Sequence, residues 1–255
     1  MRQQAIIRIA SDLAMPVANS RLRVTAVAGG SFGGMQSLEW FVSHPDRIKS
    51  AIPIATTAKH SPQQIAFNEV GRQAIMADPH WKDGNYFDGP PPAKGLAVAR
   101  MVGHITYMSD KSMAEKFGRQ LKGEKQAFKF TADFEVEGYL RNRGDHFVKR
   151  FDADTYLYIT KAMDLYDAAR GKHLYEVFKG IKSKIMVIAF KSDWLYPASQ
   201  SLEIVRACKL AGIDTTYCEI DSTYGHDAFL LEVEEETHLV KHFLNSVSNG
   251  NNGGH

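Results

Sequence analysis

Short apolar runs alternate with segments of helical periodicity along this chain of 255 residues. The apolar runs predict strands at residues 23–28, 49–55, 184–190 and 215–220, and the segments between them predict helices at 33–43, 198–211 and 228–245. Strands that alternate with helices in this way are typical of a parallel sheet. The chain is therefore predicted to have an α/β fold with a mostly parallel sheet.

The stretch between the second and third predicted strands has a different pattern. Residues 63–77 and 96–101 have helical periodicity, and the sequence Gly-Pro-Pro-Pro at 89–92 interrupts it. We therefore expect an inserted helical lid at 61–180. The α/β core would then consist of residues 1–60 and 181–246.

The two ends of the chain have patterns of their own. Apolar residues at positions 5, 6, 9, 10 and 13 have helical spacing, and Pro16 is expected to end that helix. A secretory signal is the weaker interpretation, because Arg8 and Asp12 interrupt the apolar run. Residues 247–255 are polar and rich in glycine, which predicts a disordered tail.

The first predicted strand leads into the sequence Gly-Gly-Ser-Phe-Gly-Gly at 29–34, which contains the pattern Gly-x-Ser-x-Gly. This pattern predicts a nucleophile elbow, a sharp turn from strand to helix that exposes the hydroxyl of Ser31. Side chains at Gly29 and Gly33 are expected to collide across the turn, and Gly34 is expected to let the helix pack closely on the sheet. The alternative is a Gly/Ser-rich loop without a nucleophile.

An elbow serine calls for an acid and a histidine later in the chain, each after a strand. Asp193 follows the predicted strand at 184–190, and His226 follows the one at 215–220, with Gly225 freeing the backbone just before it. Taken singly, Asp193 is equally well a turn or helix cap, and His226 an ordinary surface or core histidine. Together they complete the order Ser, Asp, His.

These residues predict covalent acyl chemistry. His226 would take the proton of Ser31 as the serine attacks an acyl carbonyl, and Asp193 would fix the imidazole tautomer. The Phe32 amide is the expected oxyanion donor. A second donor normally comes from a loop well before the elbow, and 30 residues precede Ser31 here.

Blocks of sequence along most of the chain, from about residue 21 to 245, resemble the homoserine O-acetyltransferase family. The longest are Gly-Gly-Ser-Phe-Gly-Gly-Met-Gln-Ser-Leu-Glu-Trp at 29–40, Ser-Asp-Trp-Leu-Tyr-Pro at 192–197 and Gly-His-Asp-Ala-Phe-Leu at 225–230. Shorter matches lie at 64–72, 74–75, 78–79, 81–86, 95–96, 99–100, 106–107, 116–119, 151–153, 156–158 and 161–164.

The resemblance implies an α/β-hydrolase fold, with Ser31, Asp193 and His226 as the catalytic triad. It also implies that Arg100, Tyr107 and Asp227 hold homoserine. Arg100 offers a planar fork for the carboxylate, and Asp227 can accept from the ammonium group. Tyr107 follows Arg100 by two helical turns, so a helix would bring both to one cavity.

The activity implied is transfer of an acetyl group from acetyl-CoA, as co-substrate, to the hydroxyl of L-homoserine in methionine biosynthesis. No bound cofactor is expected, and the resemblance implies a homodimer formed through the lid. The family usually has Met after the serine where this chain has Phe32. Its members also carry a longer segment before the elbow, so the N-terminal strands of the sheet are expected to be missing, which would leave residues 21–28 as an apolar edge.

Composition excludes several other classes of protein. With 31 basic and 29 acidic residues the net charge is +2, so neither nucleic acid nor a membrane surface is an expected partner. The two cysteines, Cys208 and Cys218, form no disulfide framework, which suits a cytoplasmic protein. The ten histidines are scattered without metal-ligand spacing, so no metal is expected.

Two other functions remain open at this stage. One is an esterase of the same fold, and the other is a truncated, inactive homologue. Succinyl-CoA as donor and serine as acceptor also remain open, because the sequence does not determine the shape of the substrate pocket.

Overall fold

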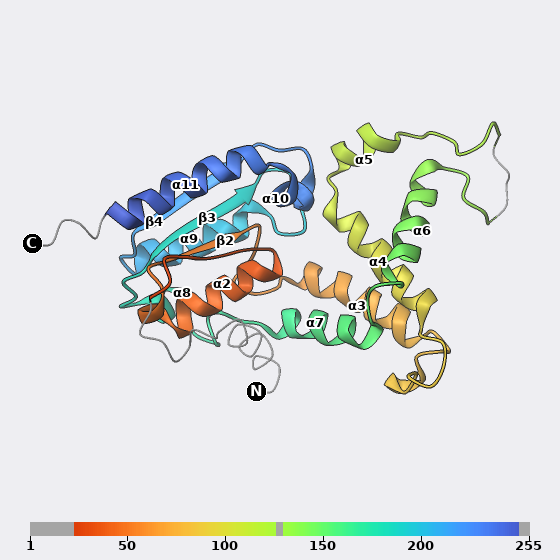
Figure 1. Cartoon of the computed structure of the whole chain (residues 1–255), viewed down its shortest axis with the longest axis horizontal. Coiled ribbons are helices and arrows are strands. Elements are labelled where there is room, and N and C mark those ends of the chain that lie inside the picture. The colour runs from red at the N-terminus through yellow and green to blue at the C-terminus, as the bar shows by residue number, and fades with distance from the viewer. Residues whose placement is uncertain (1–22, 126–129, 250–255) are drawn as a thin grey trace, which may run out of the picture. The chain divides into compact units, whose positions relative to one another are not determined.

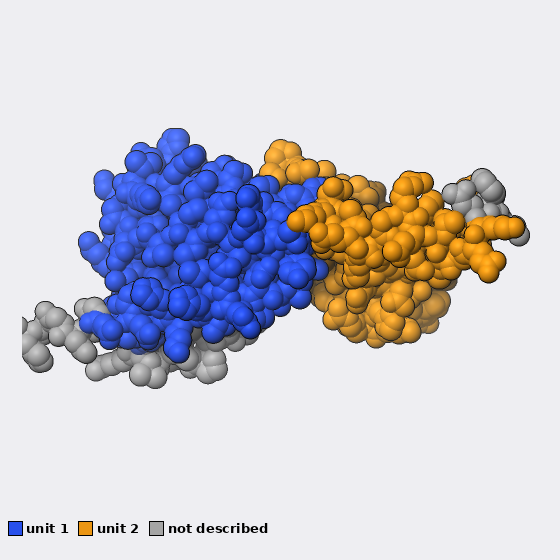
Figure 2. All heavy atoms as spheres, turned by 90° about the horizontal axis from the view of Figure 1, so that it is seen from above, with its two compact units in different colours: residues 1–60, 165–255 blue, residues 61–164 orange. Residues whose placement is uncertain are grey.

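The structure is a computed structural model that describes residues 23–125 and 130–249. It divides into two compact units (Figure 2). Unit 1 comprises Met1–His60 and Leu165–His255, and unit 2 comprises Ser61–Asp164. The chain therefore leaves unit 1 after the second strand and returns to it before the third.

The described part of unit 1 contains a parallel sheet of four strands in the order β1-β2-β3-β4. The strands are β1 (Val27–Gly30), β2 (Ser50–Ile54), β3 (Lys184–Phe190) and β4 (Thr215–Ile220). The predicted parallel α/β sheet is confirmed. β3 and β4 have the predicted bounds, whereas β1 begins four residues later than the predicted 23. Before it, Val24 pairs with Ile48 only as an isolated parallel bridge, and the Ser50 hydroxyl donates to the Thr25 carbonyl at 2.8 Å.

The two faces of the sheet follow the alternation of side chains along each strand. Residues of even number, such as Ile52, Met186 and Ile188, pack in one cluster with Phe243 and Val247 of α11 (Val233–Asn249). Residues of odd number are also buried, including Val187 and Ala189. Figure 1 shows α11 on one side of the sheet and α2 (Phe32–Ser43) and α8 (Leu174–Phe178) on the other. Both faces are thus covered, as the apolar strands require.

The remaining described elements of unit 1 are helices between the strands and after β4. They are η1 (Pro45–Arg47), α9 (Ala198–Leu210), η3 (Gly225–Asp227) and α10 (Ala228–Leu231). The single helix predicted at 228–245 is two helices, α10 and α11, because the chain leaves helical geometry at Glu232.

Unit 2 is built of helices, as the periodicity predicts. They are α3 (Pro62–Met76), η2 (Lys82–Gly84), α4 (Ala93–Tyr107), α5 (Asp110–Phe117), α6 (Glu135–Phe147) and most of α7 (Ala153–Leu165). α4 packs against both α3 and α6. A Cβ at Gly95 would lie 2.3 Å from the Ala74 carbonyl oxygen, so glycine lets α4 approach α3 closely. The buried ion pair between Arg72 and Asp164, at 2.7 Å, joins α3 to α7.

The insert is shorter than the predicted 61–180. Unit 2 starts at Ser61, but residues 165–180 belong to unit 1. Tertiary contacts hold them there: the Ala168 N–H donates to the Ala58 carbonyl at 2.9 Å, and Phe178 meets Phe41 edge to face at 5.5 Å between ring centroids. That unit 2 acts as a lid remains a prediction.

The predictions for the two ends have different outcomes. The tail predicted to be disordered at 247–255 is wrong for its first part, since α11 continues to Asn249 and Val247 is buried against the sheet. Residues 250–255 and the predicted helix before Pro16 lie outside the described residues.

Candidate active site

Ser31 lies between the end of β1 and the start of α2, in a strained backbone conformation with φ 54° and ψ −119°. A non-glycine residue with positive φ costs free energy, so its surroundings must impose it. Three hydrogen bonds do so. The Ser31 N–H donates to the Ile54 carbonyl at 2.9 Å, and the Ser31 carbonyl accepts from the Thr56 hydroxyl at 2.7 Å and the Gly34 N–H at 2.9 Å. The strand-to-helix turn is therefore a rigid one.

Glycine is required at two positions around Ser31, for a different steric reason at each. A Cβ at Gly29 would lie 2.3 Å from the Gly33 carbonyl oxygen, and one at Gly34 would lie 2.6 Å from the Thr56 side chain. The prediction for these two glycines is confirmed. The prediction for Gly33 is wrong, because a Cβ there would meet none of the described atoms within 4 Å. The steric restriction in the turn thus applies at Gly29, where an added Cβ would point into the turn, and not at Gly33.

Ser31, His226 and Asp193 form one hydrogen-bonded chain. His226 Nε2 lies 2.8 Å from Ser31 Oγ, and His226 Nδ1 lies 2.7 Å from Asp193 Oδ2. His226 and Asp193 are each only 3% exposed. A carboxylate can only accept, so a neutral His226 carries its proton on Nδ1 and presents the lone pair of Nε2 to the serine hydroxyl.

Asp193 is also held by the backbone. Its Oδ1 accepts from the N–H groups of Leu195 and Tyr196 at 3.0 and 2.8 Å. The two interpretations left open for this residue are therefore both correct in geometry: it caps the turn with one oxygen and meets His226 with the other. The cap fixes which oxygen faces the imidazole.

The loop that carries His226 is tied to the loop that carries Asp193. The Gly225 N–H donates to Ser192 Oγ at 2.9 Å, and Gly225 has φ 73°, a conformation that suits glycine. The prediction that Gly225 gives the backbone a conformation open to glycine is thus confirmed. The turn places His226 in η3 with its ring directed at Asp193 and Ser31.

Aromatic rings enclose the imidazole. The rings of Tyr196 and Phe229 have centroids 5.0 and 5.3 Å from that of His226. The Tyr196 hydroxyl is in turn hydrogen-bonded to His60 Nε2 at 2.8 Å, and both side chains are buried. Sequence analysis missed this pair, because 136 residues separate His60 from Tyr196 and the only local signal was that Tyr196 lies in the block at 192–197.

Phe32, the predicted oxyanion donor, is the first residue of α2. Among the described residues its N–H has no hydrogen-bond acceptor. Unpaired N–H groups and the helix dipole make a helix N-terminus favourable for negative charge. The position suits an oxyanion donor, and that role remains a prediction.

Of the residues predicted to hold homoserine, Asp227 directly follows His226 in η3 and is half-buried. Arg100 and Tyr107 lie in unit 2, where both belong to α4. The Arg100 guanidinium carbon is 5.3 Å from the centroid of the Tyr107 ring, so the two share a helix face as their spacing predicts.

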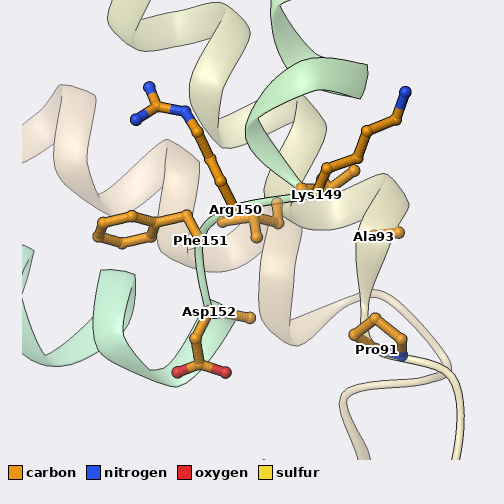
Figure 3. Close-up of a pocket in the computed structure, with 9 residues that line it drawn as sticks. Pro91, Ala93, Lys149, Arg150, Phe151 and Asp152 are labelled. Atoms are coloured by element: carbon orange, nitrogen blue, oxygen red, sulfur yellow. The ribbon is translucent and has the colours of Figure 1, made fainter.

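Unit 2 contains a hollow of about 390 Å³, which Figure 3 shows. Pro91, Ala93 and Phe151 are among the residues that line it, and none of the predicted site residues does. Within residues 23–125 and 130–249 no cluster of three or more His, Cys, Asp or Glu side chains could hold a metal ion. In the same residues, no helix is both long and apolar enough to cross a membrane.

The family model described as alpha/beta hydrolase fold matches residues 18–233. The chain belongs to this family. This chain is 53% identical over 224 residues to the homoserine O-acetyltransferase of Methanobrevibacter ruminantium, and the match covers 87% of the chain and 46% of the relative. The predicted resemblance to that family is confirmed.

Solved structures agree on the fold of this α/β-hydrolase. The homoserine O-acetyltransferase of Bacillus anthracis superposes with a TM-score of 0.85 at 25% identity over 95% of the chain and 65% of the solved chain. Esterase E22 superposes with a TM-score of 0.83 at 21% identity over 95% of the chain and 66% of its own, a likeness of fold alone. The α/β-hydrolase spans about half the length of the curated relatives it matches.

Proposed function

We propose that the chain belongs to a homoserine O-acetyltransferase, which moves an acetyl group from acetyl-CoA to the hydroxyl of L-homoserine through an acyl-serine intermediate. The observation that carries the acyl chemistry is the hydrogen-bonded chain from Ser31 through His226 to Asp193. The choice of donor and acceptor is supported by relatives about half identical in sequence that are named homoserine O-acetyltransferases.

In the first half-reaction, Ser31 Oγ attacks the thioester carbonyl while His226 Nε2 takes its proton. Asp193 stabilises the imidazolium that forms. The Phe32 N–H donates to the developing oxyanion, and one such donor is typically worth about 3 to 4 kcal/mol of the barrier. Collapse of the tetrahedral intermediate breaks the carbon–sulfur bond, and His226 returns the proton to the departing thiolate.

In the second half-reaction, His226 takes the proton of the homoserine hydroxyl, which attacks the acetyl group on Ser31. The serine leaves, regains its proton from His226, and O-acetylhomoserine forms. We assign Arg100 to the carboxylate of homoserine, Asp227 to its ammonium group and Tyr107 to its orientation, on the resemblance and on the charges of these groups. Such a sequence gives ping-pong kinetics.

We also propose that the protein works as a homodimer in the cytoplasm, with contacts made by unit 2. Exposed Val98 and Ile105 on α4 support such contacts, because their spacing of seven residues places them on one stripe of the helix. An enzyme that consumes acetyl-CoA and makes a biosynthetic intermediate fits that compartment.

The proposal is tested by release of thiol from acetyl-CoA by the folded chain, with and without L-homoserine. We expect release that depends on homoserine, together with formation of O-acetylhomoserine. Thiol release or ester cleavage that homoserine does not change would indicate an esterase. Folded protein without either activity would favour an inactive homologue, and parallel assays with succinyl-CoA and L-serine decide the donor and the acceptor.

A further inference from the structure

Unit 2 contains a second, smaller pocket, of about 220 Å³, between α4 and α6. We call it the basic pocket, since five of its seven lining residues are arginine or histidine. The residues that line it are Arg100, His104, Asn142, Arg143, His146, Phe147 and Arg150. None of them is acidic, and only Arg100 has a role in the proposed function.

Aromatic rings fix the three guanidinium groups of the basic pocket. Arg100 and Arg150 lie over the ring of Phe147, with their guanidinium carbons 4.7 and 5.5 Å from its centroid, and Arg143 lies 5.1 Å from the ring of Tyr139. Stacking uses the flat face of a guanidinium and leaves the N–H groups at its edge available. Within the described part of the chain, these three side chains form no hydrogen bond or ion pair.

One of the two histidines of the basic pocket, His104, responds to its burial and to the positive charges around it. Burial, and after it the charges of Arg100, Arg143, Lys116 and Arg150, lower the pKa of His104 to about 4. His104 is therefore neutral at pH 7, and its Nδ1 lies 3.2 Å from the Tyr139 hydroxyl. A site that holds several cations this close, with no carboxylate in its lining, is built to receive an anion.

The neighbouring acidic residue does not supply that anion. The Asp152 carboxylate accepts from the Tyr86 hydroxyl and from the N–H and hydroxyl of Thr155. Figure 3 shows the Arg150 side chain extending away from Asp152, with the Lys149 side chain diverging from that of Arg150. Arg150 lines the basic pocket as well as the hollow of Figure 3, and it has no acidic partner among the described residues. Lys149 lines the hollow alone and offers a control of the same charge.

We propose that the basic pocket binds the terminal phosphate monoester of the acyl-CoA co-substrate through Arg143 and Arg150. This rests on the proposed function, which supplies a coenzyme with that group. A phosphate monoester carries a charge near −2 at pH 7 and presents three oxygens, so it can receive the N–H edges of two guanidinium groups together. The carboxylate of homoserine carries a single charge and is matched by Arg100 alone.

Binding is tested by calorimetric titration of the full chain with CoA and with 3′-dephospho-CoA, which lacks the monoester. We expect Arg143→Gln and Arg150→Gln each to weaken CoA binding about tenfold, the size typical of one charge-assisted hydrogen bond, and to leave dephospho-CoA nearly unaffected. The controls Arg141→Gln on α6 and Lys149→Gln should bind CoA as the unchanged chain does. Both are exposed, and neither lines the basic pocket.

Unchanged CoA affinity in both pocket variants would overturn the proposal, and so would equal losses for CoA and dephospho-CoA. A kinetic measurement separates this result from the proposed function. With S-acetyl-N-acetylcysteamine, a thioester without phosphate, the variants should acetylate homoserine at the unchanged rate, while their KM for acetyl-CoA rises about tenfold. Absence of transfer from either thioester would contradict the proposed function and leave the binding result to decide the role of the pocket.

Discussion

Replacing Ser31 with alanine is expected to lower acyl transfer by about four to six orders of magnitude. The substitution removes the hydroxyl that forms the acyl-enzyme in the proposed mechanism. His226 would keep its bond to Asp193 but would have no serine proton to take. Alanine carries the same Cβ as serine, so the strained turn is retained and the loss is chemical rather than structural.

Initial rates of homoserine-dependent thiol release measure this effect. Ser201→Ala is the matched control, because Ser201 is buried on α9 and its hydroxyl has no hydrogen-bond partner among the described residues. It should retain full activity. A Ser31→Ala chain that transfers acetyl groups within about tenfold of the unchanged rate would remove Ser31 from the mechanism.

Replacing Asp193 with asparagine is expected to lower the rate by about four orders of magnitude. The N–H groups of Leu195 and Tyr196 need an acceptor at the position of Asp193 Oδ1, so the side-chain oxygen of the asparagine would take that position. Its NH₂ group would then face His226 Nδ1 and demand an acceptor there. The proton of the imidazole would move to Nε2, where it can no longer accept from Ser31.

The same assay measures this loss, with Asp221→Asn as control. Asp221 lies in the chain between β4 and His226, and its exposed ion pair with Lys191, at 3.3 Å, contributes little to stability. The control should therefore keep nearly the unchanged rate. An Asp193→Asn chain with nearly full activity would show that His226 does not depend on this carboxylate for its tautomer.

The parts of the site that could be predicted from the sequence are those built from adjacent residues. The elbow is local, since Gly29, Ser31 and Gly34 form it within six residues, and the parallel sheet brings the ends of β1, β3 and β4 to one edge. The order Ser, Asp, His then suffices to place the acid and the base together. The spacing of Arg100 and Tyr107 predicts that they share one face of a helix, which α4 confirms, whereas their common role in holding homoserine stays a prediction.

The parts that could not be predicted depend on packing between distant segments. His60 reaches Tyr196 only after β2 and β3 pair, and the basic pocket exists only where α4 packs on α6. The end of the insert was misplaced because the pattern at 165–180 does not reveal that Phe178 packs on Phe41. No local pattern encodes such contacts.

In the proposed mechanism Ser31 carries the acetyl group, and mass spectrometry of the trapped intermediate can detect it there. The folded chain would be mixed with acetyl-CoA without acceptor, quenched in acid and digested. We expect one added acetyl group on the peptide that contains Ser31, and its loss when L-homoserine is added before the quench. An acetyl group on another residue, or homoserine-dependent transfer with no acetylated Ser31 at any time, would contradict it.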